Sequence, residues 1–262
     1  MKKNYGYTIK NYHDNYYFVD ENNEGFEVPK SVLETDLNDL KAHYYYDNGS
    51  NVYKLLFNND KSNELGSYYR FILIDFGTTN PREKSQIIDL FNDLIINADF
   101  IELQDKVIFV YTNELDIDMK DIVEAINFDF ATNIYIYESG KVYCKNLGAF
   151  NLLFKAYVQA SQTLQLNYMS NSDIIINLIK KDSGKLNLLR PIILNTIAID
   201  SQYEVLVNAM FNNSLNVTKT AKDVFMHRNT INNKLDFIKS ETNLNIQKFK
   251  DAMAMYWLIN AK

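Results

Sequence analysis

The sequence predicts an α+β protein in which a β-rich N-terminal segment and an α/β middle domain precede an all-helical C-terminal domain. Short runs of strand-forming residues alternate with turn clusters over the first 66 residues. Strand-length and helix-length apolar patterns then alternate to about residue 166, and only helical spacing follows. We expect a β-rich segment over 1–66, an α/β domain over 67–166, a helical connector over 167–199 and a helix-turn-helix domain over 200–262.

The N-terminal segment is rich in Tyr and Asn, and its runs of strand-forming residues predict a small antiparallel meander. The expected strands are Tyr7–Tyr12, Tyr16–Asp20 and Phe26–Val28, followed by a short helix from the N-cap Thr35 to about His43 and a short element at Val52–Phe57. Tyr44–Tyr46 fits a ligand-stacking cluster, but aromatic residues that close a small sheet are the favoured interpretation.

The middle domain begins with Phe71–Phe76, an apolar run typical of a strand that is covered on both faces. Strand, helix, strand, strand, helix and strand then follow in order, which predicts an α/β sandwich around a mixed sheet. The later elements are a helix Glu83–Ala98 after Pro81, a hairpin of Asp99–Leu103 and Lys106–Tyr111, a helix Met119–Phe128, and the runs Asn133–Tyr137 and Lys141–Cys144 around a turn at Glu138–Gly140.

Beyond Leu147 all apolar spacing is helical. Pro191 is expected to break the helical stretch before the next helix begins, because proline lacks the amide that a helix interior needs. The expected helices are Ala149–Leu166, Asp173–Lys181, Ile192–Ile199 and one that starts after a cap at Asp200 or Ser201 and ends near Asn212.

Composition excludes several classes of protein. The chain has 262 residues, 47% of them hydrophobic and 23% charged, with a net charge of −6, which is typical of a folded soluble protein. Cys144 is alone and the three histidines are far apart, so we expect no disulfide and no metal site. The closest glycines, Gly140 and Gly148, are too far apart for a dinucleotide or Walker A loop, so we expect no cofactor. We expect a cytoplasmic protein with no membrane partner, because the sequence has neither a signal peptide nor an apolar run of about 18 residues.

Residues 216–241 have the pattern of a helix-turn-helix. Thr218–Val224 predicts a short helix, Phe225–His227 a tight turn and Arg228–Ser240 a longer helix. Ala221 is small where the second helix must approach. The second helix carries one apolar stripe, made of Ile231, Leu235 and Ile238.

The exposed face of that second helix presents side chains suited to DNA. Arg and Asn can pair with the edges of guanine and adenine. Residues 200–262 carry a net charge of +2 whereas the preceding 199 residues carry −8, and a cation excess favours phosphate contacts. The same spacing and charge also fit a helical dimerisation bundle with a solvated polar face. The polar residues are Arg228, Asn229, Asn232, Asn233, Lys234 and Lys239.

These residues resemble the C-terminal helix-turn-helix domain of the PucR/CdaR family, the bacterial regulators of purine catabolism and sugar diacids. The resemblance lies in Asn216–Thr218 with Ala221, in His227–Ile231 with Leu235 and Ile238, and in a final helix at Asp251–Leu258. It implies a transcriptional regulator whose second helix enters the major groove of double-stranded DNA. The candidate DNA-binding residues are then Thr218, Lys219, Lys222, His227, Arg228, Asn229, Thr230, Asn232, Asn233 and Lys234.

The region from Arg70 to about Gln165 is similar to the degenerate, GGDEF-like nucleotide-cyclase domain that many family members carry. Active cyclases of that fold use an acid in the first strand for metal and a glycine-containing hairpin for nucleotide. Asp75 lies in the expected first strand, but the hairpin at Leu103–Val107 has no glycine and carries Lys106 where a second metal-binding acid is needed. We therefore expect no enzyme activity.

The leading hypothesis is a DNA-binding transcriptional regulator that responds to a small-molecule metabolite. A homodimer is expected, because one recognition helix contacts only a few base pairs and two half-sites supply useful affinity. The alternative is an interaction or dimerisation protein that does not bind DNA but retains the helix-turn-helix fold.

Overall fold

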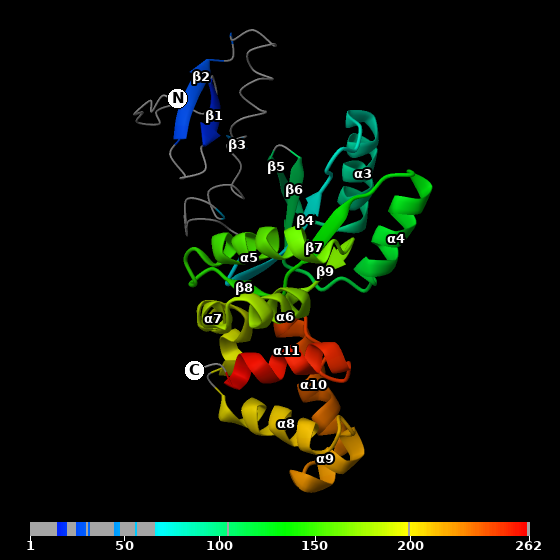
Figure 1. Cartoon of the computed structure of the whole chain (residues 1–262), viewed down its shortest axis with the longest axis vertical. Coiled ribbons are helices and arrows are strands. Elements are labelled where there is room, and N and C mark those ends of the chain that lie inside the picture. Colours follow the sequence, from blue (N-terminus) through cyan, green and yellow to red (C-terminus); the bar gives the residue numbers. More distant parts are fainter. Residues whose placement is uncertain are drawn as a thin grey trace.

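The computed structural model describes residues 15–19, 25–29, 31, 45–47, 56, 66–103, 105–198 and 200–260. The described elements are arranged along one long axis (Figure 1). A small sheet lies at one end, a larger sheet with its helices lies in the middle, and a group of helices lies at the other end.

The small sheet has the strand order β2-β1-β3 and is antiparallel throughout. Its strands are β1 (Asn15–Val19), β2 (Gly25–Pro29) and β3 (Tyr45–Asp47). The two predicted strands at 16–20 and 26–28 are thereby confirmed. Tyr45 and Tyr46 lie in β3 and pair with β1 through their backbones. The predicted elements at 7–12 and 35–43 lie outside the described residues, as does 52–57 apart from Leu56.

The larger sheet is mixed, as predicted, with the order β5-β6-β4-β7-β9 and with β8 also paired to β4. The central strand β4 is antiparallel to β6 and β7, whereas β7 and β9 are parallel. The predicted hairpin is confirmed with its bounds. The strands are β4 (Tyr68–Asp75), β5 (Asp99–Leu103), β6 (Lys106–Tyr111), β7 (Tyr135–Glu138), β8 (Val142–Tyr143) and β9 (Tyr168–Met169).

Helices cover both faces of this sheet, which explains the continuous apolar run of β4. Ile72 and Ile74 face a core shared with α3 (Pro81–Leu94) and α4 (Met119–Asp129). The alternate residues Phe71 and Leu73 face the opposite side, where α5 (Ala149–Leu164) packs. There the rings of Phe71 and Phe150 meet edge to face, with centroids 5.1 Å apart.

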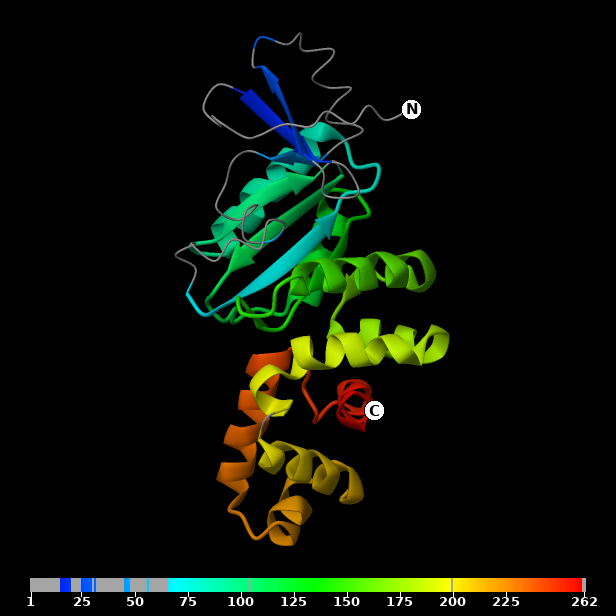
Figure 2. The same cartoon turned by 90° about the vertical axis from the view of Figure 1, so that its left-hand side faces the viewer.

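The second core continues from the sheet into the C-terminal helices. In Figure 2, α5 and α6 stack between the sheet and the remaining helices. One cluster of buried side chains joins Phe71 of the sheet to Ile175, Met255 and Ile238. The helices beyond α5 are α6 (Asn171–Lys181), α7 (Leu186–Leu194), the 3₁₀ helix η2 (Asn195–Ala198), α8 (Ser201–Asn212), α9 (Val217–Asp223), α10 (Arg228–Thr242) and α11 (Phe249–Asn260).

Two predictions of helix extent are wrong. Helix α3 ends at Leu94 rather than at Ala98, because Ile95 leaves the helical conformation with φ of −103° and ψ of 83° and Asn97 then takes a left-handed one with φ of 60°. The predicted helix Ile192–Ile199 does not begin after Pro191, because Pro191 lies inside α7 and the 3₁₀ helix η2 follows from Asn195. Pro191 removes only its own amide donor, and the buried face of α7 packs into the core on either side of it.

The two strands predicted on either side of the turn at 138–140 do not pair with each other. The turn at 138–140 does not fold β8 back onto β7, since both strands pair with β4 in the same direction. Ser139 fills the break between them, because its amide donates to Phe71 O at 3.0 Å and its hydroxyl accepts from Phe71 N at 2.8 Å. The two-residue strand β9 was not predicted.

Within the described ranges, no helix is long and apolar enough to cross a membrane. Within the same part of the chain, no group of three or more His, Cys, Asp or Glu side chains could hold a metal ion.

Candidate nucleic-acid interface

Helix α9 and the turn after it have the local geometry of a helix-turn-helix. The side chain of Asn216 caps α9 by accepting the amide of Lys219 at 3.0 Å. The helix ends in a Schellman turn, in which the amide of Met226 donates to Ala221 O at 2.9 Å. Phe225 takes the left-handed position of this turn with φ of 54°, where glycine is usual. The chain therefore passes from α9 to α10 through residues 224–227, one residue more than the predicted turn.

Helix α10 begins at Arg228, as predicted. His227 caps it, because its Nδ1 accepts the amide of Asn229 at 3.2 Å. The predicted stripe of Ile231, Leu235 and Ile238 is buried. The core side of α10 is thus held against the other helices, and its outer side is left to solvent.

The structure brings the predicted DNA-binding residues together on α9, the turn and the first half of α10. Lys234 differs from the others, because it is half-buried and turned toward α8. Its Nζ donates to Gln202 Oε1 at 3.2 Å and lies 5.0 Å from the ring centroid of Tyr203. The other nine are exposed: Thr218, Lys219, Lys222, His227, Arg228, Asn229, Thr230, Asn232 and Asn233.

The charge around the start of α10 suits an anion. Lys219, Lys222 and Arg228 are exposed, and their side chains make no ion pair with any residue in the described ranges. The nearby carboxylate of Asp223 accepts a hydrogen bond from Asn213 Nδ2 at 3.1 Å. The first amides of a helix attract phosphate, so this end of α10 can combine phosphate contacts with base-edge contacts.

Asp75, the acid considered for metal binding, is held by the neighbouring lysine. Lys106 Nζ lies 3.2 Å from Asp75 Oδ2 and 2.8 Å from Asp105 Oδ2. Burial alone would lower the pKa of Lys106, but its hydrogen bonds and charge contacts with these two acids raise it overall. The ammonium group therefore stays charged beside Asp75, which also accepts the amide of Gly77 at 3.0 Å.

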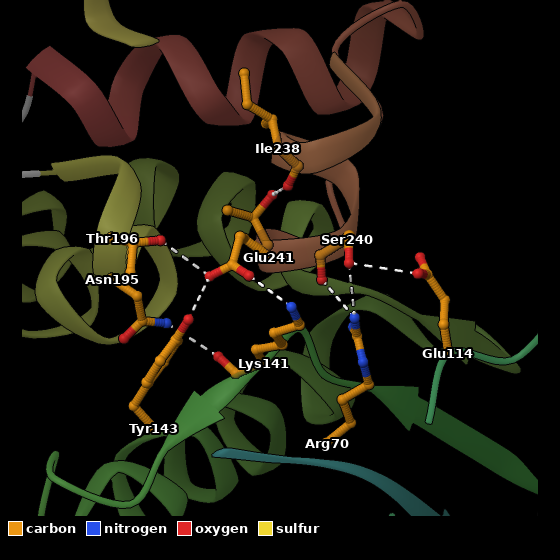
Figure 3. Close-up of polar contacts among 10 residues, drawn as sticks. Arg70, Glu114, Lys141, Tyr143, Asn195, Thr196, Ile238, Ser240 and Glu241 are labelled. Carbon is orange, nitrogen blue, oxygen red and sulfur yellow. Dashed lines mark hydrogen bonds and ion pairs between the residues drawn. The ribbon is translucent and has the colours of Figure 1, made fainter. Parts of the chain in front are cut away.

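Sequence reasoning missed a second polar cluster at the opposite end of α10. Glu241 is buried there and pairs with Lys141 of the sheet domain, with 2.6 Å between the charged atoms (Figure 3). A signal was present, because Glu241 follows Ile238 by three positions and continues the apolar stripe of the helix. A charged residue at such a position predicts a buried partner.

Helices α9 and α10, joined by so tight a turn and with α8 packed against α9, have the arrangement of a helix-turn-helix domain. Residues 206–261 match the family model of the PucR C-terminal helix-turn-helix domain. Among solved structures, the chain is similar to a regulator of polyketide synthase expression from Bifidobacterium adolescentis. The two share 13% sequence identity over 88% of this chain and 93% of that chain, with a TM-score of 0.35. No curated protein matches the sequence.

Proposed function

We propose that the protein is a DNA-binding transcriptional regulator of the PucR/CdaR type. The observation that carries this proposal is the exposed, cationic start of α10 within a domain that matches the PucR helix-turn-helix model. Helix α10 would enter the major groove with Arg228 and Asn229 at base edges, while Lys219 and Lys222 of α9 contact the phosphate backbone.

Selection of bound fragments from the host genome tests this function, followed by titration of one selected fragment at several salt concentrations. Binding through phosphate contacts weakens steeply as salt rises. The slope of the logarithm of the binding constant against the logarithm of the salt concentration becomes more negative by about 0.9 for each contact. We expect a steep slope on the selected fragment and a lower affinity for a scrambled one. Absence of any selected fragment would contradict the proposal.

The middle domain would then act as a cyclase-like scaffold without turnover. The support is the ion pair between Lys106 and Asp75, because a fixed cation occupies the side of the acid that a metal ion would need. Such a domain is free to sense a small-molecule metabolite or to hold two chains together.

A homodimer follows from the same proposal, since two recognition helices on a two-fold axis read two half-sites. Light scattering at micromolar concentration, with and without a selected fragment, measures the assembly. A monomer under both conditions would speak against it.

A second function is favoured by two details of the same surface. Lys234 is drawn away to Gln202 and Tyr203, and the ring of Phe225 is 96% exposed at the turn. An exposed aromatic side chain beside a reduced cationic face also suits a protein partner. Under this alternative the domain is an interaction module, and no selected DNA fragment would bind.

A further inference from the structure

The last three carbonyl groups of α10 are capped by distant parts of the chain, whereas Lys239 O before them accepts the amide of Asn243 at 2.8 Å. The final carbonyl groups of a helix have no partner within the helix, so they need donors from elsewhere. Here three consecutive carbonyl oxygens accept hydrogen bonds from three separate parts of the chain (Figure 3 shows the first). The pairs are Arg70 Nη2 with Ser240 O at 2.6 Å, Lys141 N with Glu241 O at 2.8 Å, and Asn171 Nδ2 with Thr242 O at 2.8 Å.

The carboxylate of Glu241 adds a second layer to this contact. Its side chain is only 2% exposed, and its partners all lie outside α10. Lys141 Nζ lies at 2.6 Å, the hydroxyl of Tyr143 donates at 2.8 Å, and the hydroxyl of Thr196 donates at 3.0 Å. Burial together with the hydrogen bond and charge of Glu241 raises the pKa of Tyr143 to about 12, so its hydroxyl keeps its proton. A buried carboxylate is tolerated only with such partners, which ties its position to theirs.

Gly140 permits this close approach. A methyl group at Gly140 would lie 2.6 Å from Thr242 C and 2.8 Å from Glu241 O, and the obstructing atoms are backbone atoms that cannot rotate aside. We name the contact among Arg70, Gly140, Lys141, Asn171 and residues 240–242 the α10 joint. It joins residues of the larger sheet and the start of α6 to the C-terminal end of α10 through directional bonds and one steric fit.

The α10 joint and the candidate DNA contacts lie at opposite ends of one stiff helix. Fifteen residues of α-helix span about 22 Å at 1.5 Å per residue. In Figure 1 the N-terminal end of α10 lies beside α9, away from the sheet, and its C-terminal end lies toward α6. A tilt of about 10° at the joint would therefore move the start of α10 by about 4 Å, more than the tolerance of a base contact.

We propose that Arg70, Lys141 and Asn171, together with the close approach at Gly140, are positioning elements for DNA recognition. They hold α10 from its C-terminal end and set the direction in which Arg228 and Asn229 meet the groove. This inference rests on the proposed function. It adds that specific binding requires the sheet domain, because that domain completes the cap of the recognition helix.

Gly140→Ala tests the proposal in the full chain, with Gly184→Ala as its matched control. A methyl group at Gly184 would meet only Asp182 Oδ1 at 3.5 Å, which is ordinary contact. Hydrogen–deuterium exchange should rise at residues 240–242 in Gly140→Ala and stay unchanged there in Gly184→Ala. Affinity for a selected DNA fragment should fall about tenfold in Gly140→Ala, while affinity for a scrambled fragment and the salt slope stay unchanged.

A second pair of variants covers the case in which Gly140→Ala does not fold. Lys141→Met removes the charge that faces Glu241. Its matched control is Lys106→Met, which removes a lysine of similar exposure that pairs with Asp75, away from α10. Only Lys141→Met should lower specific affinity, again by about tenfold, and Lys141→Arg should restore most of it.

The outcomes separate the α10 joint from the proposed function. Raised exchange at residues 240–242 with unchanged specific affinity would overturn the positioning role. Equal losses for selected and scrambled fragments would also overturn it, since they indicate partial unfolding. If the wild-type protein binds no DNA, the proposed function fails and the positioning role falls with it, whereas the exchange data still show whether the joint holds α10.

Discussion

Arg228→Ala should weaken sequence-specific binding while leaving the fold intact. Arg228 is the first residue of α10, is exposed, and makes no ion pair with any described residue. Alanine is a good helix former, so the free energy of unfolding should change by no more than about 0.5 kcal/mol. A lost bidentate contact to guanine costs about 1 to 3 kcal/mol, which corresponds to about one to two orders of magnitude in affinity. Preference should relax at one position of each half-site.

Fluorescence anisotropy with a selected and a scrambled fragment, over a range of salt concentrations, measures both affinity and salt slope. Lys219→Ala and Lys222→Ala are matched controls, because phosphate-contacting lysines should weaken both fragments alike and flatten the slope by about one charge per protomer. Far-ultraviolet circular dichroism checks each fold. A folded Arg228→Ala that binds the selected fragment with unchanged affinity and slope would refute the reading of DNA by α10 and favour the interaction module.

Three further predictions concern the core and the sheet. Leu235→Ala should lower the free energy of unfolding by about 2 to 5 kcal/mol in urea titrations, because that side chain is buried; a loss below about 1 kcal/mol would contradict its place in the core. Burial raises the pKa of Glu138, so the folded state binds its proton more tightly than the unfolded state. The free energy of unfolding should therefore fall as pH rises from the ordinary glutamate range through that raised pKa, and be flat above it. Glu138→Gln should remove this part of the pH dependence. If the urea midpoints of wild type and Glu138→Gln change with pH in the same way, the prediction is contradicted. Asp75→Asn should leave DNA affinity unchanged and lower the free energy of unfolding by about 1 kcal/mol or less. Nucleotide turnover that is present in the wild type and lost in this variant would reverse the expectation of no enzyme activity.

Local patterns predicted the elements whose stability comes from near neighbours. The hairpin of β5 and β6 has the predicted bounds, because two strand-length runs rich in apolar residues and a short polar turn between them suffice to define it. The start of α10 at Arg228 and its stripe of Ile231, Leu235 and Ile238 follow from a cap and from helical spacing. The candidate DNA-binding residues were found for the same reason, since they lie on one short stretch of chain.

Tertiary packing decided the features that depend on partners far along the chain. Strand β9 has two residues, too few for a period, and exists because β7 offers a free edge. Pro191 stays inside α7, because burial of apolar residues before and after it in the helix outweighs the loss of one backbone hydrogen bond. The α10 joint joins residues that are 170, 100 and 71 positions apart. Hydrogen bonds over such separations leave no local periodicity in a sequence, so only the folded chain shows that these residues meet at the C-terminal end of α10.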